Sequence, residues 1–157
     1  MPCCATTAAA PTLRWIFAGL AATAALPASG CTLALPPPTA LAPVDRATFP
    51  EEAGPLLAQA CGDAKCHGRT DRPLRLYAVG RLRLLAANRY TATPLQPNEW
   101  DANYNAVLGF VDAPAPRQTT LLRKGLGQMA HGGKAVFEAP SDPQFRALEA
   151  WLSGKPW

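Results

Sequence analysis

The chain has 157 residues, of which 17 are Pro and 12 are Gly; 48% are hydrophobic, 17% are charged, and the formal net charge is +4. This length and composition exclude a multidomain protein, a coiled coil and a collagen-like fibre. A mean hydropathy of −0.03 and the small net charge also argue against disorder along the whole chain. We therefore expect one small domain with extensions.

Residues 1–30 have the order of a secretory signal peptide. Arg14 precedes an uncharged apolar run, residues 15–26, which is too short to span a bilayer as a helix but suits the core of a signal peptide. Cys3 and Cys4 would be removed with this segment. Three small residues then lead to Cys31, and these are Ala28, Ser29 and Gly30.

This approach to Cys31 resembles the lipobox of bacterial lipoproteins, in which the cysteine receives a diacylglycerol and becomes the N-terminus after cleavage. Ala28 stands where that motif usually has Leu or another branched residue. A plain secretory cleavage near the same place is therefore the alternative. Thr32, rather than Asp, after the cysteine resembles sorting to the outer membrane in enteric bacteria. The resemblance implies a lipid-anchored protein of the bacterial cell envelope, on the outer membrane and facing the periplasm.

Residues 31–45 form a proline-rich tether in this interpretation. Prolines favour an extended polyproline conformation and exclude a helix. Four of them stand in this stretch, and these are Pro36, Pro37, Pro38 and Pro43. The tether would connect a lipidated Cys31 to the folded domain, which we place at residues 46–157.

Three helices are predicted in this domain. Thr48 and Glu51 form a T-x-x-E capping box in front of a helix that runs into Cys61. A second helix is expected from about Asn98 to Val111, because its apolar residues recur at helical spacing. A third begins at a cap, Ser141 or Asp142, and ends before Gly154. Its expected apolar stripe consists of Phe145, Leu148, Trp151 and Leu152.

A leucine- and arginine-rich stretch separates the first two helices. Its leucines alternate with arginines, which predicts either short strands or a loop whose leucines lie on the core. The leucines are Leu74, Leu76, Leu82 and Leu84, and the arginines are Arg69, Arg72, Arg75, Arg81, Arg83 and Arg89. Asp71 is the single acid among them. We expect a solvated basic face, with a docking patch for an acidic partner or anionic groups as the alternative. No nucleic-acid-binding motif accompanies it, so a nucleic-acid partner is not predicted.

The pattern C-x4-C-H-G occupies residues 61–68. Two thiols followed directly by an imidazole is the order that c-type haem attachment needs, because each Cys adds to a haem vinyl group and the adjacent His ligates the iron. The usual spacing is C-x-x-C-H, and here two further residues separate the thiols. Sites with the longer spacing are known, mostly in multihaem cytochromes.

The domain resembles the cytochrome c-like domains of bacterial lipoproteins from about Thr48 to Leu152. The resemblance lies in a helix that leads into the first Cys, the CHG motif, the run PRQTTLLRKGLGQMAHGG and the closing DPQFRALEAWL. It implies a small, mainly α domain with long loops and one covalent haem c. Cys61 and Cys66 match the thioether positions, and His67 matches the proximal iron ligand.

The distal iron ligand has two candidates, His131 and Met129. A second His lowers the reduction potential and Met raises it. We prefer His131, because the two glycines after it let the backbone approach a flat ring closely. A surface or loop role for His131 is the alternative.

The expected function is one-electron transfer at the cell envelope with a redox protein partner, and no enzyme is predicted. No hydrolase or nucleotide-binding motif is present. The main alternative is a haem-free interaction module in which Cys61 and Cys66 form a disulfide, as exported thiols often do. A zinc site made by these two cysteines with His67 and His131 is a third interpretation.

Overall fold

The computed structural model describes residues 44–155. The predicted signal peptide, Cys31 and all but the last two residues of the tether lie outside the described residues, so the interpretation of residues 1–43 stays a prediction. No helix within the described part of the chain is long and apolar enough to cross a membrane.

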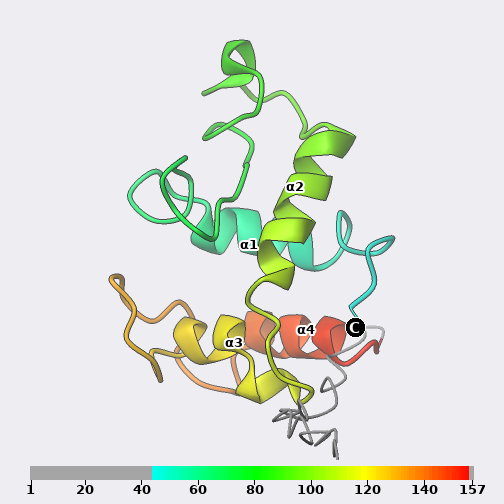
Figure 1. The fold of residues 1–157 in the computed structure, drawn as a ribbon, viewed down its shortest axis with the longest axis vertical. Coiled ribbons are helices and arrows are strands. Elements are labelled where there is room, and N and C mark those ends of the chain that lie inside the picture. Colours follow the sequence, from blue (N-terminus) through cyan, green and yellow to red (C-terminus); the bar gives the residue numbers. More distant parts are fainter. Residues whose placement is uncertain (1–43, 156–157) are drawn as a thin grey trace, which may run out of the picture. The chain divides into compact units, whose positions relative to one another are not determined.

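The described residues form a mainly helical domain with long loops (Figure 1). They contain no β-strand, so the fold class predicted from the sequence is confirmed, and the leucine-rich stretch between the first two long helices is a loop. The α-helices are α1 (Ala53–Cys61), α2 (Pro97–Leu108), α3 (Thr120–Gly125) and α4 (Pro143–Leu152), and two short 3-10 helices are η1 (Ala86–Asn88) and η2 (Pro116–Gln118).

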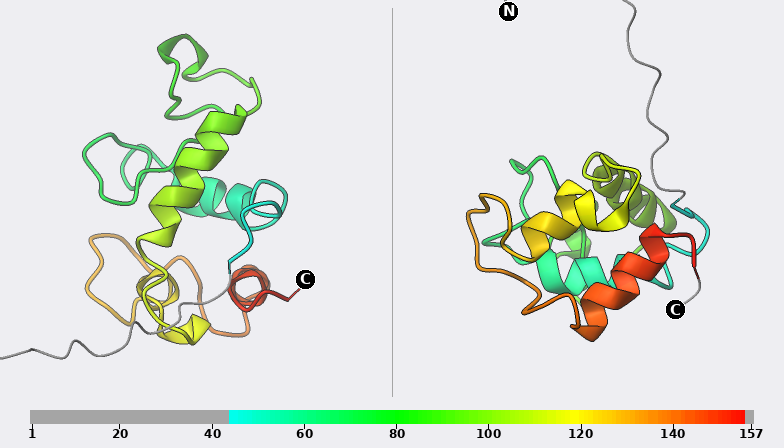
Figure 2. Two further views of the ribbon diagram at one scale, coloured as in Figure 1. Left: turned by 45° about the vertical axis from the view of Figure 1, so that its right-hand side comes forward. Right: turned by 90° about the horizontal axis from the view of Figure 1, so that it is seen from below.

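The core lies where α1 packs against α2 and α4 (Figure 2). Phe49, in the turn before α1, is 1% exposed, and its ring centre lies 5.5 Å from that of Tyr104 and 5.4 Å from that of Trp151. These contacts bring the start of the domain, α2 and α4 together around aromatic rings. The stripe predicted for the last helix is fully buried, which confirms α4 and its Asp142 cap.

The first helix begins later than the sequence predicts. The Thr48 carbonyl accepts hydrogen bonds from the amides of Glu51 and Glu52, and the turns that follow delay the helix until Ala53. The predicted capping box at Thr48 and Glu51 is therefore wrong. Burial of Phe49 favours this turn, because it holds the ring against the core. The end of the helix at Cys61 is as predicted.

The second helix is shorter than predicted at its C-terminal end, since it stops at Leu108 and Val111 lies beyond it, buried in the core. At its start, the Glu99 carboxylate accepts a hydrogen bond from the Gln96 amide at 2.9 Å. The same carboxylate binds Arg83 at 2.6 Å, and both side chains are almost fully buried. The prediction that the arginines form a solvated face is wrong for Arg83.

Helix α3 was not predicted. The Thr119 hydroxyl accepts a hydrogen bond from the Leu122 amide, and the Asp112 carboxylate accepts one from the Thr120 amide at 2.7 Å. Burial of Leu121 and Leu122 holds this short helix on the core. Its C-terminal end supports the loop that contains His131.

Candidate functional site

The loop after α1 brings Cys61 and His67 close together. The His67 amide donates to the Cys61 carbonyl at 3.1 Å, and the amides of Cys66 and Gly68 both donate to the Asp63 carbonyl at 2.9 Å. A Cβ atom at Gly68 would lie 2.3 Å from the carbonyl oxygen of Gly62. Only glycine fits at that position, which gives a structural reason for the glycine that follows Cys66 and His67.

Cys61 and Cys66 are both free thiols in the structure. Cys61 is half-buried at the end of α1, and Cys66 is exposed. Burial, and to a lesser extent the nearby Cys66, raises the pKa of Cys61 to about 11. The Cys61 thiol is therefore protonated at neutral pH. A protonated thiol is a poor nucleophile for disulfide exchange.

His67 is held in one tautomer by the backbone. Its Nδ1 lies 2.8 Å from the carbonyl oxygen of Leu74. Because a carbonyl only accepts hydrogen bonds, Nδ1 has the hydrogen and Nε2 has the free electron pair. Burial lowers the pKa of His67 below 6.5, and the hydrogen bond to Leu74 opposes this only in part. At neutral pH the imidazole is uncharged, the form that binds a metal.

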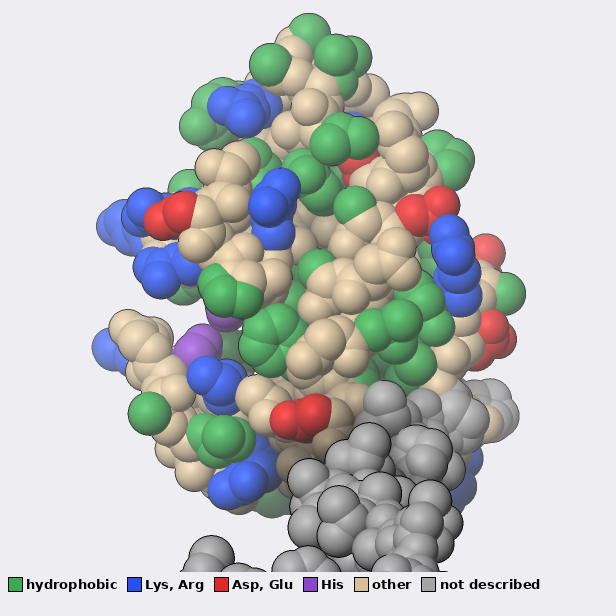
Figure 3. Space-filling view, viewed as in Figure 1, with side chains coloured by type: hydrophobic (Ala, Val, Ile, Leu, Met, Phe, Trp, Pro, Cys, Tyr) green, Lys and Arg blue, Asp and Glu red, His purple; other side chains and the backbone are tan. Residues whose placement is uncertain are grey.

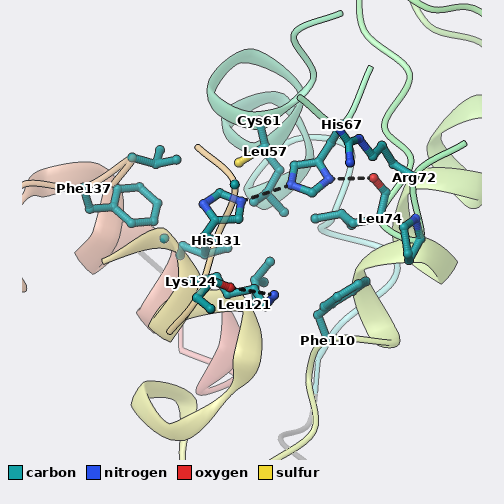
Figure 4. Close-up of a pocket in the computed structure, with 16 residues that line it drawn as sticks. Leu57, Cys61, His67, Arg72, Leu74, Phe110, Leu121, Lys124, His131 and Phe137 are labelled. Carbon is teal, nitrogen blue, oxygen red and sulfur yellow. Dashed lines mark hydrogen bonds between the residues drawn. The ribbon is translucent and has the colours of Figure 1, made fainter. Parts of the chain in front are cut away.

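His131 faces His67 across a narrow gap (Figure 4). The two Nε2 atoms are 3.5 Å apart, the ring centres are 5.8 Å apart, and the ring planes differ by 11°. With ring bonds of about 1.33 Å, each nitrogen lies about 1.15 Å from its ring centre. The two distances then agree only if both nitrogens lie on the line between the ring centres. The imidazoles are therefore edge-on to each other, nearly in one plane, and not stacked face to face.

The hydrogen bond between the two histidines is a long and weak one. At 3.5 Å the gap between the two Nε2 atoms exceeds the usual 2.7–3.2 Å of a hydrogen bond from nitrogen. The Nδ1 atom of His131 is also buried without a hydrogen-bond partner. A metal ion that binds one imidazole nitrogen on each side, at about 2 Å, separates them by about 4 Å. The pair therefore has nearly the spacing of two ligands on opposite sides of one ion.

The imidazole pair lines three hollows. The first has a volume of about 230 Å³ and is mainly apolar, with Leu57, Leu74, Phe110 and Phe137 among its lining residues. Two more open hollows, of about 450 and 120 Å³, also have both histidines in their walls. Cys61 borders the first and second hollows, and Cys66 borders the second and third. Together they offer the several hundred Å³ typical of a cofactor site.

The charged side chains around these hollows are all basic. They are Lys65, Arg72, Lys124 and Lys134, and no Asp or Glu is among the lining residues. Figure 3 shows Lys and Arg around the opening where the histidines reach the surface. A cluster of one sign favours a ligand that has negative groups.

The end of α3 determines where His131 lies. The Gly125 carbonyl accepts hydrogen bonds from the amides of Val136 and Phe137, at 2.8 and 3.0 Å. A Cβ at Gly125 would lie 2.7 Å from the Phe137 ring, so the loop packs closely against the helix. Lys124 Nζ also donates to the Ala130 carbonyl at 3.3 Å. Both ends of the His131 loop are thereby attached to α3. The sequence signal for this helix is Thr119 as its N-cap before a pair of leucines.

Of the two predicted distal ligands, the structure places His131 opposite His67. Met129 is half-buried and lines none of the three hollows. Arg72, Leu74 and Lys124 are further residues of the site that the sequence did not single out for it. Within residues 44–155, no group of three or more His, Cys, Asp or Glu side chains that could hold a metal ion is found.

No protein-family model, curated protein or solved structure matches this chain. The geometry of the site must therefore support any function by itself.

Proposed function

We propose that this domain binds one haem c covalently through Cys61 and Cys66, with His67 and His131 as the iron ligands, and that it transfers single electrons. The observation that supports this most directly is the edge-on imidazole pair, whose Nε2 atoms face each other at 3.5 Å. Haem supplies an iron whose oxidation state changes by one electron, and no substrate needs to be converted.

The residues around the pair fit such a group. Two free thiols border the same hollows as the two histidines, as thioether attachment requires. Apolar side chains, among them Leu57, Phe110 and Phe137, suit a flat apolar ring and exclude water from it. Arg72 and Lys124 at the rim suit its carboxylates.

The ligand set favours electron transfer over small-ligand binding. His67 is fixed by its hydrogen bond to Leu74, which also raises the electron-donating power of the ring. If both imidazoles bind the iron, no position is left for a substrate. Two imidazoles also give a lower reduction potential than a His and Met pair.

The proposed cellular setting follows from the sequence. Cys31 would anchor the domain to the bacterial envelope by its lipid, and residues 31–45 would keep it close to the membrane surface. A redox protein of that compartment would exchange electrons with it.

Maturation of the chain with a cytochrome c assembly system tests the attachment. We expect the intact mass to rise by one haem, and a denaturing gel to show a band that stains for haem peroxidase activity. The control is the double variant Cys61→Ala/Cys66→Ala, which should show neither. A mass equal to that of the haem-free chain less two hydrogens would instead identify a disulfide between Cys61 and Cys66, and the proposal would be wrong.

A further inference from the structure

A second surface, residues 79–90, has features that the haem proposal does not explain. Four large hydrophobic side chains are exposed among the described residues, and all of them lie in this segment, which we call the Leu–Arg loop. They are Val79 (49% exposed), Leu84 (52%), Leu85 (62%) and Tyr90 (80%). Figure 1 places this loop beyond the N-terminal end of α2, whereas α3, whose C-terminal end holds the His131 loop, follows the C-terminal end of α2.

Hydrogen bonds and an ion pair to residues 91–99 hold the Leu–Arg loop in place. Arg83 is 1% exposed, binds the Glu99 carboxylate and donates to the carbonyls of Thr93 and Pro94 at 2.7 and 2.8 Å. The Gly80 amide donates to the Thr91 carbonyl at 2.9 Å and closes the loop. The apolar side chains are thus exposed on an ordered loop. Holding that loop requires the desolvation of the buried Arg83 and Glu99 pair, which is energetically unfavourable.

The backbone at Tyr90 supports the same view. Tyr90 has φ +61, in the left-handed region that non-glycine residues rarely adopt. Such conformations are energetically unfavourable and are concentrated at sites of binding and function. Here the conformation accompanies the most exposed large hydrophobic side chain among residues 44–155.

The charged residues of the loop and its flanking segments are all arginines. Residues 72–98 contain five arginines and no Asp or Glu. Among the described residues, Arg83 has its partner in Glu99, while Arg75, Arg81 and Arg89 form no ion pair. Across a cleft from Arg89 and Tyr90 lie Asp63 and Asp71, of which Asp71 is bonded to Arg69. Figure 3 shows hydrophobic and basic surface side by side in this region.

We propose that the Leu–Arg loop contacts the surface of an anionic lipid bilayer. Leucine and tyrosine side chains flanked by arginines match the boundary between acyl chains and anionic headgroups, where Tyr is enriched and arginines reach the phosphates. An acidic protein surface would pair with the arginines but would leave the exposed leucines without an apolar partner.

A lipid at Cys31 would keep the domain near the bilayer, so the Leu–Arg loop would need only a weak affinity for the membrane. Thirteen peptide links separate Cys31 from Val44, so a lipid at Cys31 holds Val44 within about 45 Å of the bilayer. A lipid at Cys31 does not by itself determine which face of the domain turns toward the bilayer. A tethered loop needs little affinity, because the tether raises its local concentration. This inference uses the predicted anchor and is independent of haem.

Vesicle co-sedimentation tests the proposal, with the mature chain in which Cys31→Ser removes the lipid site. We expect at least tenfold more binding to phosphatidylglycerol vesicles than to phosphatidylcholine vesicles at low salt. The variant Leu84→Gln/Leu85→Gln should bind phosphatidylglycerol at least tenfold more weakly. Arg89→Gln should weaken binding about fivefold.

Arg123→Gln, an exposed arginine on α3, is the charge-matched control and should change binding less than twofold. Far-ultraviolet circular dichroism of each variant checks that the domain is folded. Wild-type binding by Leu84→Gln/Leu85→Gln, equal losses in Arg89→Gln and Arg123→Gln, or no binding of the parent chain to any vesicle would each overturn the proposal. The last result would leave a protein partner as the occupant of the loop.

Discussion

At the residue scale, two backbone groups prepare the site before any ligand is present. The Leu74 carbonyl fixes the tautomer of His67 and directs its Nε2 electron pair at His131. The Gly62 carbonyl lies where a side chain at position 68 would be, so the loop closes only with glycine there. Because one imidazole is already held in place, less conformational entropy is lost when a ligand binds.

Replacement of His131 by Ala should change the iron spectrum while leaving the attachment intact. In the proposed site Cys61 and Cys66 would form the thioethers, so mass and haem stain should match those of the wild type. The absorption spectrum should change from low-spin to high-spin, or to that of an iron bound by Met129. In the second case the reduction potential should rise, because Met replaces His.

Met129→Ala is the matched control, and its spectrum and potential should equal those of the wild type, since Met129 lines none of the hollows. The reverse pattern, with a change in Met129→Ala alone, would exchange the two assignments. If haem is attached and neither variant differs from the wild type, the iron has another ligand or none on that side. Electron transfer would then be a weaker proposal than small-ligand binding.

At the scale of elements, α1 and α3 position two side chains of the candidate site, and α2 holds a separate loop in place. Helix α1 ends at Cys61, so its last turn places the first thiol beside the imidazoles. Helix α3 holds the His131 loop through the Gly125 carbonyl. Helix α2 supplies Glu99, which binds Arg83 and so attaches the Leu–Arg loop to the domain.

The Arg83 and Glu99 pair should make stability depend on pH in acid. Burial raises the pKa of Glu99, but hydrogen bonds from Arg83 and from the amides of Gln96 and Leu84 lower it more, to a value below 4.5. The carboxylate form therefore stabilises the fold above the ordinary pKa. This contribution is lost as the pH falls below 4.5 and through the lowered pKa of the folded state.

Glu99→Gln should cost about 3–5 kcal/mol at pH 7, because it leaves the charge of Arg83 buried without a partner. Its unfolding free energy, measured in urea from pH 7 to 3, should depend less on pH than that of the wild type. Glu149→Gln is the control, since Glu149 pairs with the exposed Arg117, and its loss should be much smaller. Equal losses in the two variants would show that burial of the pair does not matter.

At the scale of the whole molecule, Cys31→Ser should release the protein from the membrane fraction. The expected change follows from loss of the predicted lipid, and a high-salt wash weakens the electrostatic attraction proposed between the Leu–Arg loop and anionic lipids. Fractionation after labelling with a radioactive fatty acid measures both location and acylation. Cys4→Ser, within the predicted signal peptide, should leave both unchanged. A mature N-terminus upstream of Cys31 would contradict the predicted anchor.

Local sequence patterns determined much of the secondary structure of this protein and part of its candidate site. Capping and apolar spacing predicted α4 and most of α2, and the C-x4-C-H-G pattern identified the residues that meet at the end of α1. These features depend on residues a few positions apart. Such signals were weaker where tertiary contacts compete with them, as at Thr48, where burial of Phe49 favours a turn over a capping box.

Only the tertiary structure decided the choice between His131 and Met129 as the side chain that faces His67. These residues are two positions apart in one loop, and the sequence offered either of them. The attachment of that loop to Gly125 and Phe137 turns His131 toward a ring that is 64 positions earlier in the chain. In the same way, Arg83 looked like one solvated arginine among six, and packing against Glu99 buried it. Such contacts depend on groups far apart in sequence, which no local pattern contains.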